Sequence, residues 1–215
     1  MYIKKNCLLT IFSFGVLIST AQKNDKISIE INYGLIGKFF GYDEAGVPQP
    51  GIAFYKKNFI GTIGGIEAKY HFGKKSYFGI GYARSINSRT IEYYGRFSGT
   101  YVGIEDFKIR HTNNFYQFYY ERQVNKKGPE LKCHLGLFYL RMSQQEVDIN
   151  NYAISFEERN FKNSKLEEGG AFFGIECSKY IDTKFELGIK SRIYYLISTN
   201  SLEAITLTPT LRYHF

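Results

Sequence analysis

The residues with the clearest chemical potential are the histidines, since the chain has only four and three of them lie in similar surroundings. His71, His134 and His214 each fall on the polar side of a stretch in which apolar and polar residues alternate. Three imidazoles could bind a transition metal, but these three come from distant segments and no motif fixes their spacing. We therefore expect hydrogen bonds inside the protein, with no metal site and no cofactor. A pH-sensitive set of side chains is the alternative, because histidine titrates near neutrality.

Two cysteines, Cys133 and Cys177, remain once the N-terminal segment that contains Cys7 is set aside. They lack the paired spacing of a zinc site. Both fall on the apolar side of neighbouring alternating stretches, a few residues from a tight turn. They would form a disulfide if strand pairing placed them opposite each other, and a shift of two residues would prevent it.

Aromatic and basic residues occur together in two long segments, at 41–58 and 95–112. The binding candidates are Tyr42, Phe54, Tyr55, Lys56, Lys57, Arg96 and Tyr101. This combination suits a phosphorylated glycolipid or the surface of an extracellular partner. The alternative, which we prefer, is that these segments pack on themselves while their charges meet lipid phosphates without specificity.

The N-terminus has the three parts of a secretory signal peptide, namely basic Lys4 and Lys5, an apolar run over 7–18 and small residues over 19–21. The apolar run is shorter than the ~20 residues that span a bilayer as a helix. We therefore expect a cleaved signal over residues 1–21 and one domain over 22–215. The formal charge of +8 becomes 8 − 2 = +6 without the two lysines. Export argues against nucleic acid as the partner and favours anionic lipid or surface glycolipid.

The remaining sequence is patterned as β-strands. It is rich in aromatic residues, with 19 Tyr and 19 Phe in the whole chain, and these favour strands. Apolar residues alternate with small or polar ones in eight stretches, at 27–40, 59–72, 77–85, 115–124, 131–139, 171–178, 185–193 and 205–215. This period of two predicts eight antiparallel strands.

The connections between these strands alternate in length. Tight turns lie at 73–76, 125–129 and 181–183, and long segments lie at 41–58, 95–112 and 144–168. Short turns at one end and long loops at the other are typical of an outer-membrane barrel. With an even strand number, both termini fall at the short-turn end, which is the periplasmic one. We therefore predict an all-β fold, an eight-stranded antiparallel up-and-down transmembrane β-barrel.

The two faces of the strands differ in a way that decides which one points inward. An eight-stranded barrel has an interior just wide enough for its own side chains. The large apolar face would overfill that space, whereas the other face carries glycines and charges of both signs. A basic residue that faces the middle of a bilayer costs about 2–4 kcal/mol, so the charged face must line the lumen. We expect the lumen to be closed by an ion-pair network of Glu30, Glu67, Lys69, Glu121, Lys132, Glu176, Glu186, Lys190, Arg192 and Arg212.

Two residues depart from this pattern. Pro209 lies within the last strand and lacks an N–H group, so a ladder bond is lost there unless the strand has a bulge or gap. Arg84 falls on the lipid-facing side of the third strand. Either its long side chain reaches toward the interface or a bulge changes the register.

The segments YHFGKKSYFGIGYARS and TLRYHF resemble those of the small outer-membrane barrels of Gram-negative bacteria, of the OmpA and OmpX type. The resemblance covers the whole mature chain and implies a location in the outer membrane, with lipid and lipopolysaccharide around the barrel. It also implies that the alternating C-terminal residues Leu211, Tyr213 and Phe215 are the signal read by the barrel-assembly machinery. Members differ mainly in their loops, so the resemblance says little about function.

Small outer-membrane barrels include lipid A-modifying enzymes, which need a histidine with a serine or carboxylate near the outer leaflet. His111 is the candidate here, with Ser98 and Glu105 in the same segment, but no spacing supports a triad. We expect no catalytic residue. The function we predict is a non-enzymatic, structural or surface-binding barrel with an unidentified extracellular ligand, and the alternatives are a lipid A-modifying enzyme and a narrow pore.

Overall fold

The computed structural model describes residues 26–39, 52–57, 59–73, 75–97, 99–125, 128–149 and 154–215. Nearly all of them lie in strands, and the helix among them is one short turn. The elements are β1 (Ile27–Lys38), β2 (Ile52–Lys57), β3 (Ile60–Gly73), β4 (Ser76–Phe97), β5 (Thr100–Gln123), β6 (Glu130–Ile149), β7 (Ile154–Asn160), α2 (Phe161–Ser164), β8 (Glu167–Tyr180), β9 (Phe185–Leu196) and β10 (Ser201–His214). No helix in the described segments is long and apolar enough to cross a bilayer.

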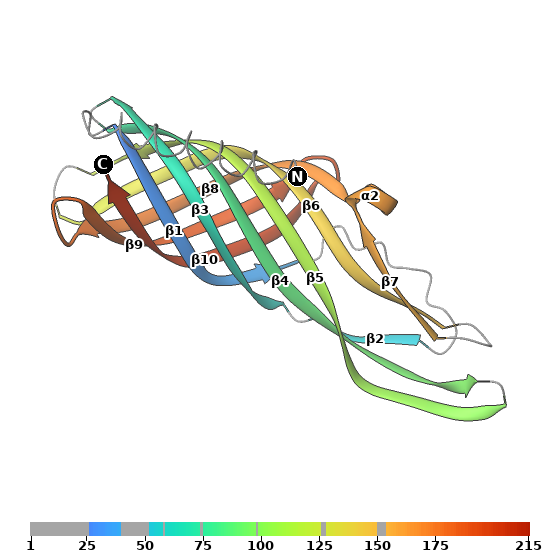
Figure 1. Ribbon diagram of the computed structural model, residues 1–215. Coiled ribbons are helices and arrows are strands. Elements are labelled where there is room, and N and C mark those ends of the chain that lie inside the picture. Colours follow the sequence, from blue (N-terminus) through green and yellow to red (C-terminus); the bar gives the residue numbers. More distant parts are fainter. Residues whose placement is uncertain are drawn as a thin grey trace, which may run out of the picture.

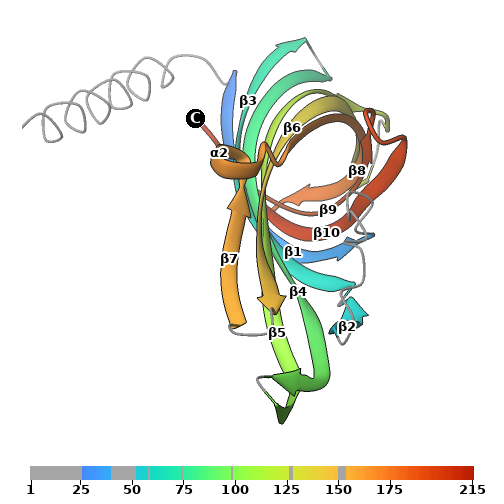
Figure 2. The same cartoon turned by 90° about the vertical axis from the view of Figure 1, so that its right-hand side faces the viewer.

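Eight of the strands close into a ring (Figure 2). The pairing runs β4–β3–β1–β10–β9–β8–β6–β5 and returns from β5 to β4, and every pair is antiparallel. The last strand pairs with the first, and the amide of Phe215 donates to the carbonyl of Ile27 at 3.2 Å. The predicted eight-stranded antiparallel barrel is therefore confirmed.

The join between β1 and β10 contains the gap anticipated at Pro209. The ladder is paired from Ser28–His214 to Asn32–Thr210 and again from Leu35–Leu207 onward, with a break between. Proline has no N–H to donate, so the break falls where a bond could not form. Gly34 lies in the break, where a Cβ atom would overlap the backbone oxygen of Leu207. The two strands therefore approach closely at this point.

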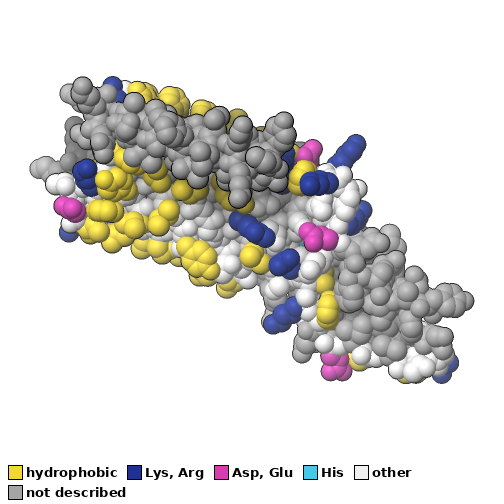
Figure 3. All heavy atoms as spheres, in the orientation of Figure 1, with side chains coloured by type: hydrophobic (Ala, Val, Ile, Leu, Met, Phe, Trp, Pro, Cys, Tyr) yellow, Lys and Arg dark blue, Asp and Glu magenta, His cyan; other side chains and the backbone are white. Residues whose placement is uncertain are grey.

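Alternation along the strands sorts the side chains as expected. Glu30, Glu67, Lys69 and Arg212 are among the charged residues with at most 2% of their surface exposed, and they point into the lumen. Large apolar residues on the other face remain exposed, for example Leu35, Ile80, Phe118, Leu137 and Ile189. On the face drawn in Figure 3, apolar side chains cover much of the visible barrel wall. Charges inside and apolar groups outside are the reverse of a water-soluble barrel, and this distribution suits lipid as the surrounding solvent.

The lumen is not polar throughout, and here the prediction was incomplete. Beyond the charged layer, inward-facing apolar residues fill the barrel, namely Ile36, Ile63, Phe115, Phe138, Leu140, Phe172, Tyr194 and Leu196. Tyr194 lies at their centre, with ring centroids 4.9–5.4 Å from those of Phe115, Phe138 and Phe172. The glycines of this face, such as Gly79 beneath the ring of Tyr119, make room for these large groups. The lumen thus has an ionic layer and an aromatic layer.

The barrel is extended at one end by strands that continue past the ring (Figure 1). β4 and β5 pair from Ser76–Arg122 to Phe97–Thr100, so most of 95–112, predicted as a loop, is strand. Likewise β6 continues to Ile149 and pairs with β7, which replaces much of the loop predicted at 144–168. β2 adds to the outer edge of β4. The short turns and the C-terminus lie at the opposite end of the barrel (Figure 1).

Candidate functional site

All ten residues of the predicted ion-pair network lie together inside the barrel. Each is at most 2% exposed, and they come from seven of the eight barrel strands. Five are carboxylates and five are cations, so the formal charge of the set is zero. A buried charge is tolerated only when it is paired and hydrogen-bonded, and the geometry meets that requirement.

Lys69 and Arg212 each contact three or more carboxylates from different strands. The ammonium of Lys69 lies 2.7 Å from Glu30, 2.6 Å from Glu121 and 3.5 Å from Glu176. The guanidinium of Arg212 lies 2.8 Å from Glu30, 3.2 Å from Glu121, 2.8 Å from Glu176 and 3.3 Å from Glu186. Both cations therefore bridge carboxylates from β1, β5 and β8 and tie opposite walls of the barrel together.

A second group of pairs lies against the aromatic layer. The guanidinium of Arg192 donates to both carboxylate oxygens of Glu67, at 2.7 and 2.9 Å, and to Gln117 at 2.6 Å. Its centre is 4.6 Å from the ring centroid of Tyr119, whose hydroxyl also donates to Glu67. Lys190 lies 2.7 Å from the same carboxylate. Arg192 thus joins the two layers of the lumen.

Lys132 and Glu186 close the network at the short-turn end. Lys132 donates to Glu186 and lies 3.0 Å from Glu130, and His214 lies 3.0 Å from Glu186. With these pairs, the ionic layer extends to the rim of the barrel.

A third polar group, at the far end of the lumen, was missed by the sequence analysis. Lys38 lies 3.5 Å from Glu203, and Asn113 donates to Glu203 at 3.1 Å and accepts from Lys38 at 3.3 Å. All three are buried. Glu203 lies within a bulge of β10, between Leu202 and Ala204, which shifts the alternation so that a simple period of two does not place it inside.

The three lumen histidines do not meet one another. His71 stacks on Tyr77 at 4.5 Å, His214 contacts Glu186, and His134 lies in the ionic layer. His134 does lie within 4.8 Å of Glu121 and Glu176, a set that could hold a cation. Lys69 and Arg212 already occupy both carboxylates, so positive charge is supplied by the protein itself.

The histidine proposed for an enzyme is not assembled with its partners. His111 is buried in β5. Glu105 accepts from the hydroxyl of Tyr94 at 2.7 Å and lies six residues along the same strand, which places it about 20 Å from His111 at ~3.3 Å per residue. Ser98 lies outside the described residues. These residues therefore form no triad as far as the described chain shows.

The two cysteines are offset rather than opposed. Cys133 pairs with Ile175, and Cys177 pairs with Leu131, so the register differs by two residues from the one a disulfide needs. Both thiols are free. The disulfide considered from the sequence is therefore wrong for this structure, because a period-two pattern leaves such a shift undetermined.

The binding candidates of the long segments are only partly visible. Tyr42 lies outside the described residues, as do the side chains of Phe54, Tyr55, Lys56 and Lys57, whose backbone forms β2. Arg96 and Tyr101 lie at the tip of the β4–β5 hairpin, where the guanidinium is 5.4 Å from the ring centroid. This tip is solvent-exposed.

The C-terminal residues lie where an interfacial role requires them. Leu211 pairs with Ile31, and the ring of Tyr213 is 5.1 Å from those of Phe185 and Phe215. This aromatic group sits on the outer wall at the short-turn end. Their reading by an assembly machinery stays a prediction.

The chain is similar to several solved barrel structures at low sequence identity. No protein-family model and no curated protein matches the chain. Solved structures with a similar fold include Ail, the attachment invasion locus protein of Yersinia pestis, with 14% identity and a TM-score of 0.49 over 88% of this chain and 98% of Ail. Neisserial surface protein A has 14% identity and a TM-score of 0.45 over 88% and 97%, and the N-terminal barrel domain of Pseudomonas aeruginosa OprF has 12% and 0.44 over 87% and 97%.

Such low identities concern the fold alone. The closed ring, the ionic lumen and the apolar exterior of this structure carry the assignment. In its architecture, the chain is a small eight-stranded β-barrel of the outer-membrane type.

Proposed function

We propose that the protein is a non-enzymatic outer-membrane barrel that anchors a surface-exposed β-sheet. In this proposal the short turns and both termini of the mature chain face the periplasm, after removal of residues 1–21. The ionic and aromatic layers fill the lumen, so the barrel acts as an anchor rather than a channel.

The observation that carries the proposal is the continuation of the barrel wall beyond the ring. β2, β4, β5, β6 and β7 form one sheet in that order, and its tip reaches Phe97 and Thr100. Within the described strands, β2 pairs only with β4 and β7 only with β6, so each presents a strand edge. Strand edges can pair with an added strand, and exposed Arg96 and Tyr101 add polar and aromatic contacts at the tip.

The orientation is tested by labelling intact cells with a membrane-impermeant maleimide. In a background with Cys133→Ser and Cys177→Ser, we expect Thr100→Cys at the hairpin tip to react and Thr183→Cys in a short turn to react only after the outer membrane is opened. Reaction of Thr183→Cys in intact cells would contradict the proposed orientation.

The binding role is tested by capture from the cell's surroundings with the whole barrel. We expect bound partners to be lost when residues 91–107 are replaced by a two-residue turn, and to be retained in Asp182→Ala at the opposite end. An identical set of partners for both variants would refute a role for the extension. Mass spectrometry of lipid A, with and without the protein, should show unchanged acylation if the protein is not an enzyme.

A further inference from the structure

A groove crosses the outer wall of the barrel on the β3–β6 side. It encloses about 690 Å³ and lies between two rows of outward-facing side chains. One row is Ile66, Tyr82, Tyr116 and Tyr139, and the next is Ala68, Ile80, Phe118 and Leu137, each paired across neighbouring strands. The row between them points into the lumen, so its backbone forms the floor. The groove is open on its outer side, so a bound chain would lie along the wall and keep one side toward the membrane.

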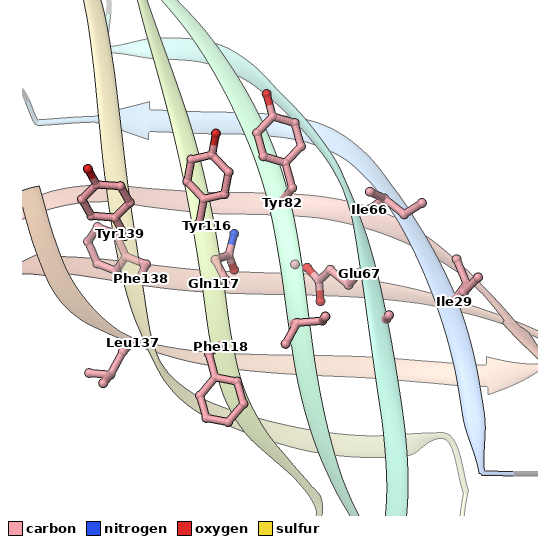
Figure 4. Close-up of a pocket in the computed structure, with 13 residues that line it drawn as sticks. Ile29, Ile66, Glu67, Tyr82, Tyr116, Gln117, Phe118, Leu137, Phe138 and Tyr139 are labelled. Atoms are coloured by element: carbon pink, nitrogen blue, oxygen red, sulfur yellow. The ribbon is translucent and has the colours of Figure 1, made fainter. Parts of the chain in front are cut away.

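The groove has one polar edge. The three tyrosines stand side by side with their hydroxyls toward the extended end of the barrel (Figure 4). The next outward row in that direction is Arg84, Asn114 and Arg141, again paired across β4, β5 and β6. Asn114 accepts from the hydroxyl of Tyr82 at 2.8 Å, and Nε of Arg141 donates to the hydroxyl of Tyr139 at 3.4 Å.

The two arginines are spaced to share one anion. Two strand spacings of ~4.8 Å separate their backbones by roughly 10 Å, with Asn114 between them. The guanidinium of Arg141 is held over the rings of Tyr139 and Tyr116, at 5.3 and 5.7 Å, and over Phe161 at 4.4 Å. Glu167 pairs with Arg141 on the β8 side and accepts from the hydroxyl of Tyr139, so a carboxylate of the protein already lies on that side of Arg141. The place left for an external anion is therefore the opposite side, above Asn114 and between the two arginines.

This row lies deeper in the membrane than basic groups usually do. The strand pairing has no register shift near Arg84, so this arginine faces the outside of the barrel. Of the two alternatives raised by the sequence, a bulge is therefore excluded. On β5 only Tyr116, Phe118 and Tyr120 separate Asn114 from Arg122 on the outer face. Eight residues at ~3.3 Å and a tilt of ~40° cover about 20 Å, less than the ~25 Å of a barrel's apolar band. With Glu167 beside Arg141, the two arginines leave this part of the wall with a net formal charge of +1, which an anion in the outer part of the lipid would balance.

The arrangement is confined to one side of the barrel. The outward positions of β1, β3, β9 and β10 carry no lysine or arginine in the described chain. A general attraction to head groups would distribute such residues around the rim. Their concentration above the groove indicates a local site.

We propose that the β3–β6 wall binds one phosphorylated glycolipid of the outer leaflet. Its acyl chains lie in the groove, and a phosphate receives hydrogen bonds from Arg84 and Arg141 over Asn114. Paired guanidinium groups suit the planar, bidentate recognition of phosphate. The assignment to the outer leaflet rests on the orientation given in the proposed function.

The proposal is tested on the purified full chain in detergent by native mass spectrometry with added bis-phosphorylated lipid A. We expect Arg84→Gln/Arg141→Gln to bind at least tenfold more weakly than the wild type. The charge-matched control Arg122→Gln/Lys179→Gln, at the opposite rim, should bind like the wild type. Equal binding by both double variants and the wild type would overturn the site.

Two further comparisons identify the ligand and the groove. Dephosphorylated lipid A and phosphatidylglycerol should each bind at least tenfold more weakly than lipid A. If dephosphorylated lipid A binds as tightly as lipid A, phosphate has no role in the site. If phosphatidylglycerol binds as tightly as lipid A, the site is one for phospholipid. Either result overturns the proposal. Ala68→Phe, which fills the groove, should also weaken binding, whereas Ser191→Phe on β9, across the barrel from the groove, should not.

The binding measurement is made in detergent, so it does not depend on orientation. If the maleimide labelling fails but lipid A binds through Arg84 and Arg141, the proposed function is wrong and the site stands. If the labelling succeeds and the arginine variants bind normally, the site is wrong and the proposed function stands. Folding of each variant is checked beforehand by far-UV circular dichroism.

Discussion

Replacement of Arg212 by methionine should strongly destabilise the barrel. The guanidinium lies within 3.3 Å of Glu30, Glu121, Glu176 and Glu186, and it is 1% exposed. Methionine fills similar space but leaves carboxylates without a partner. Removing one member of a buried ion pair costs about 3–5 kcal/mol, so the folding equilibrium should fall by two to four powers of ten.

Glu176 depends most on Arg212 for its charge partner, because the other cations near it, Lys69 and Lys132, are farther away, at 3.5 and 4.0 Å. Adding Glu176→Gln to Arg212→Met restores the balance of charge and should recover about 1–3 kcal/mol, the usual size of coupling between residues in contact. Arg122→Met, on the exposed wall, should change stability by less than about 0.5 kcal/mol.

The measurement is guanidinium chloride unfolding in detergent micelles, followed by far-UV circular dichroism because the chain contains no tryptophan. The reasoning is refuted if Arg212→Met unfolds within about 1 kcal/mol of the wild type, since a buried unpaired charge costs more than that. It is also refuted if the double variant is no more stable than the single one.

Three further outcomes follow from the lumen, the β1–β10 join and the strand register. In planar bilayers the protein should give no steady channels, and regular conductance steps would contradict the filled lumen. Gly34→Val should lower stability by about 1–3 kcal/mol, since its side chain would overlap the backbone of Leu207, and an unchanged unfolding midpoint would argue against this close contact. The wild type should show only free thiols, whereas Ile175→Cys in a Cys177→Ser background should form a disulfide with Cys133 on oxidation; the reverse result on a non-reducing gel would indicate a register shifted by two.

The barrel itself could be predicted because each strand has one face that only a narrow interior accepts and one that only lipid accepts. Glu30, for example, lies between Ile29 and Ile31, and Arg212 lies between Leu211 and Tyr213. In a closed barrel within lipid, such charged residues must face the lumen and their apolar neighbours must face the lipid. The same pattern therefore supplied the ionic layer of the lumen.

The extension and the aromatic layer could not be predicted in the same way. Above the membrane neither face of a strand has a fixed solvent, so alternation fades over 95–112 although the ladder continues. Phe138 and Phe172 lie on the polar-facing row, and their direction depends on Gly170 and Gly136, where a Cβ atom would overlap their rings. A period of two also leaves the register undetermined. The sequence therefore left the cysteine pairing open, and Arg84 was taken as an isolated exception rather than as part of a row.

The ionic layer draws its members from every barrel strand except β4, and this sets how the molecule can come apart. A sheet that has not yet curled can keep only the pairs between adjacent strands, such as Lys69–Glu30. It lacks those that cross the lumen, such as Arg192–Glu67 and Arg212–Glu121, so several charged groups stay unpaired. A half-wound intermediate would have to keep water among these groups inside the bilayer. Closure and dehydration must therefore occur in one step, and unfolding in lipid should proceed without a long-lived partial cylinder.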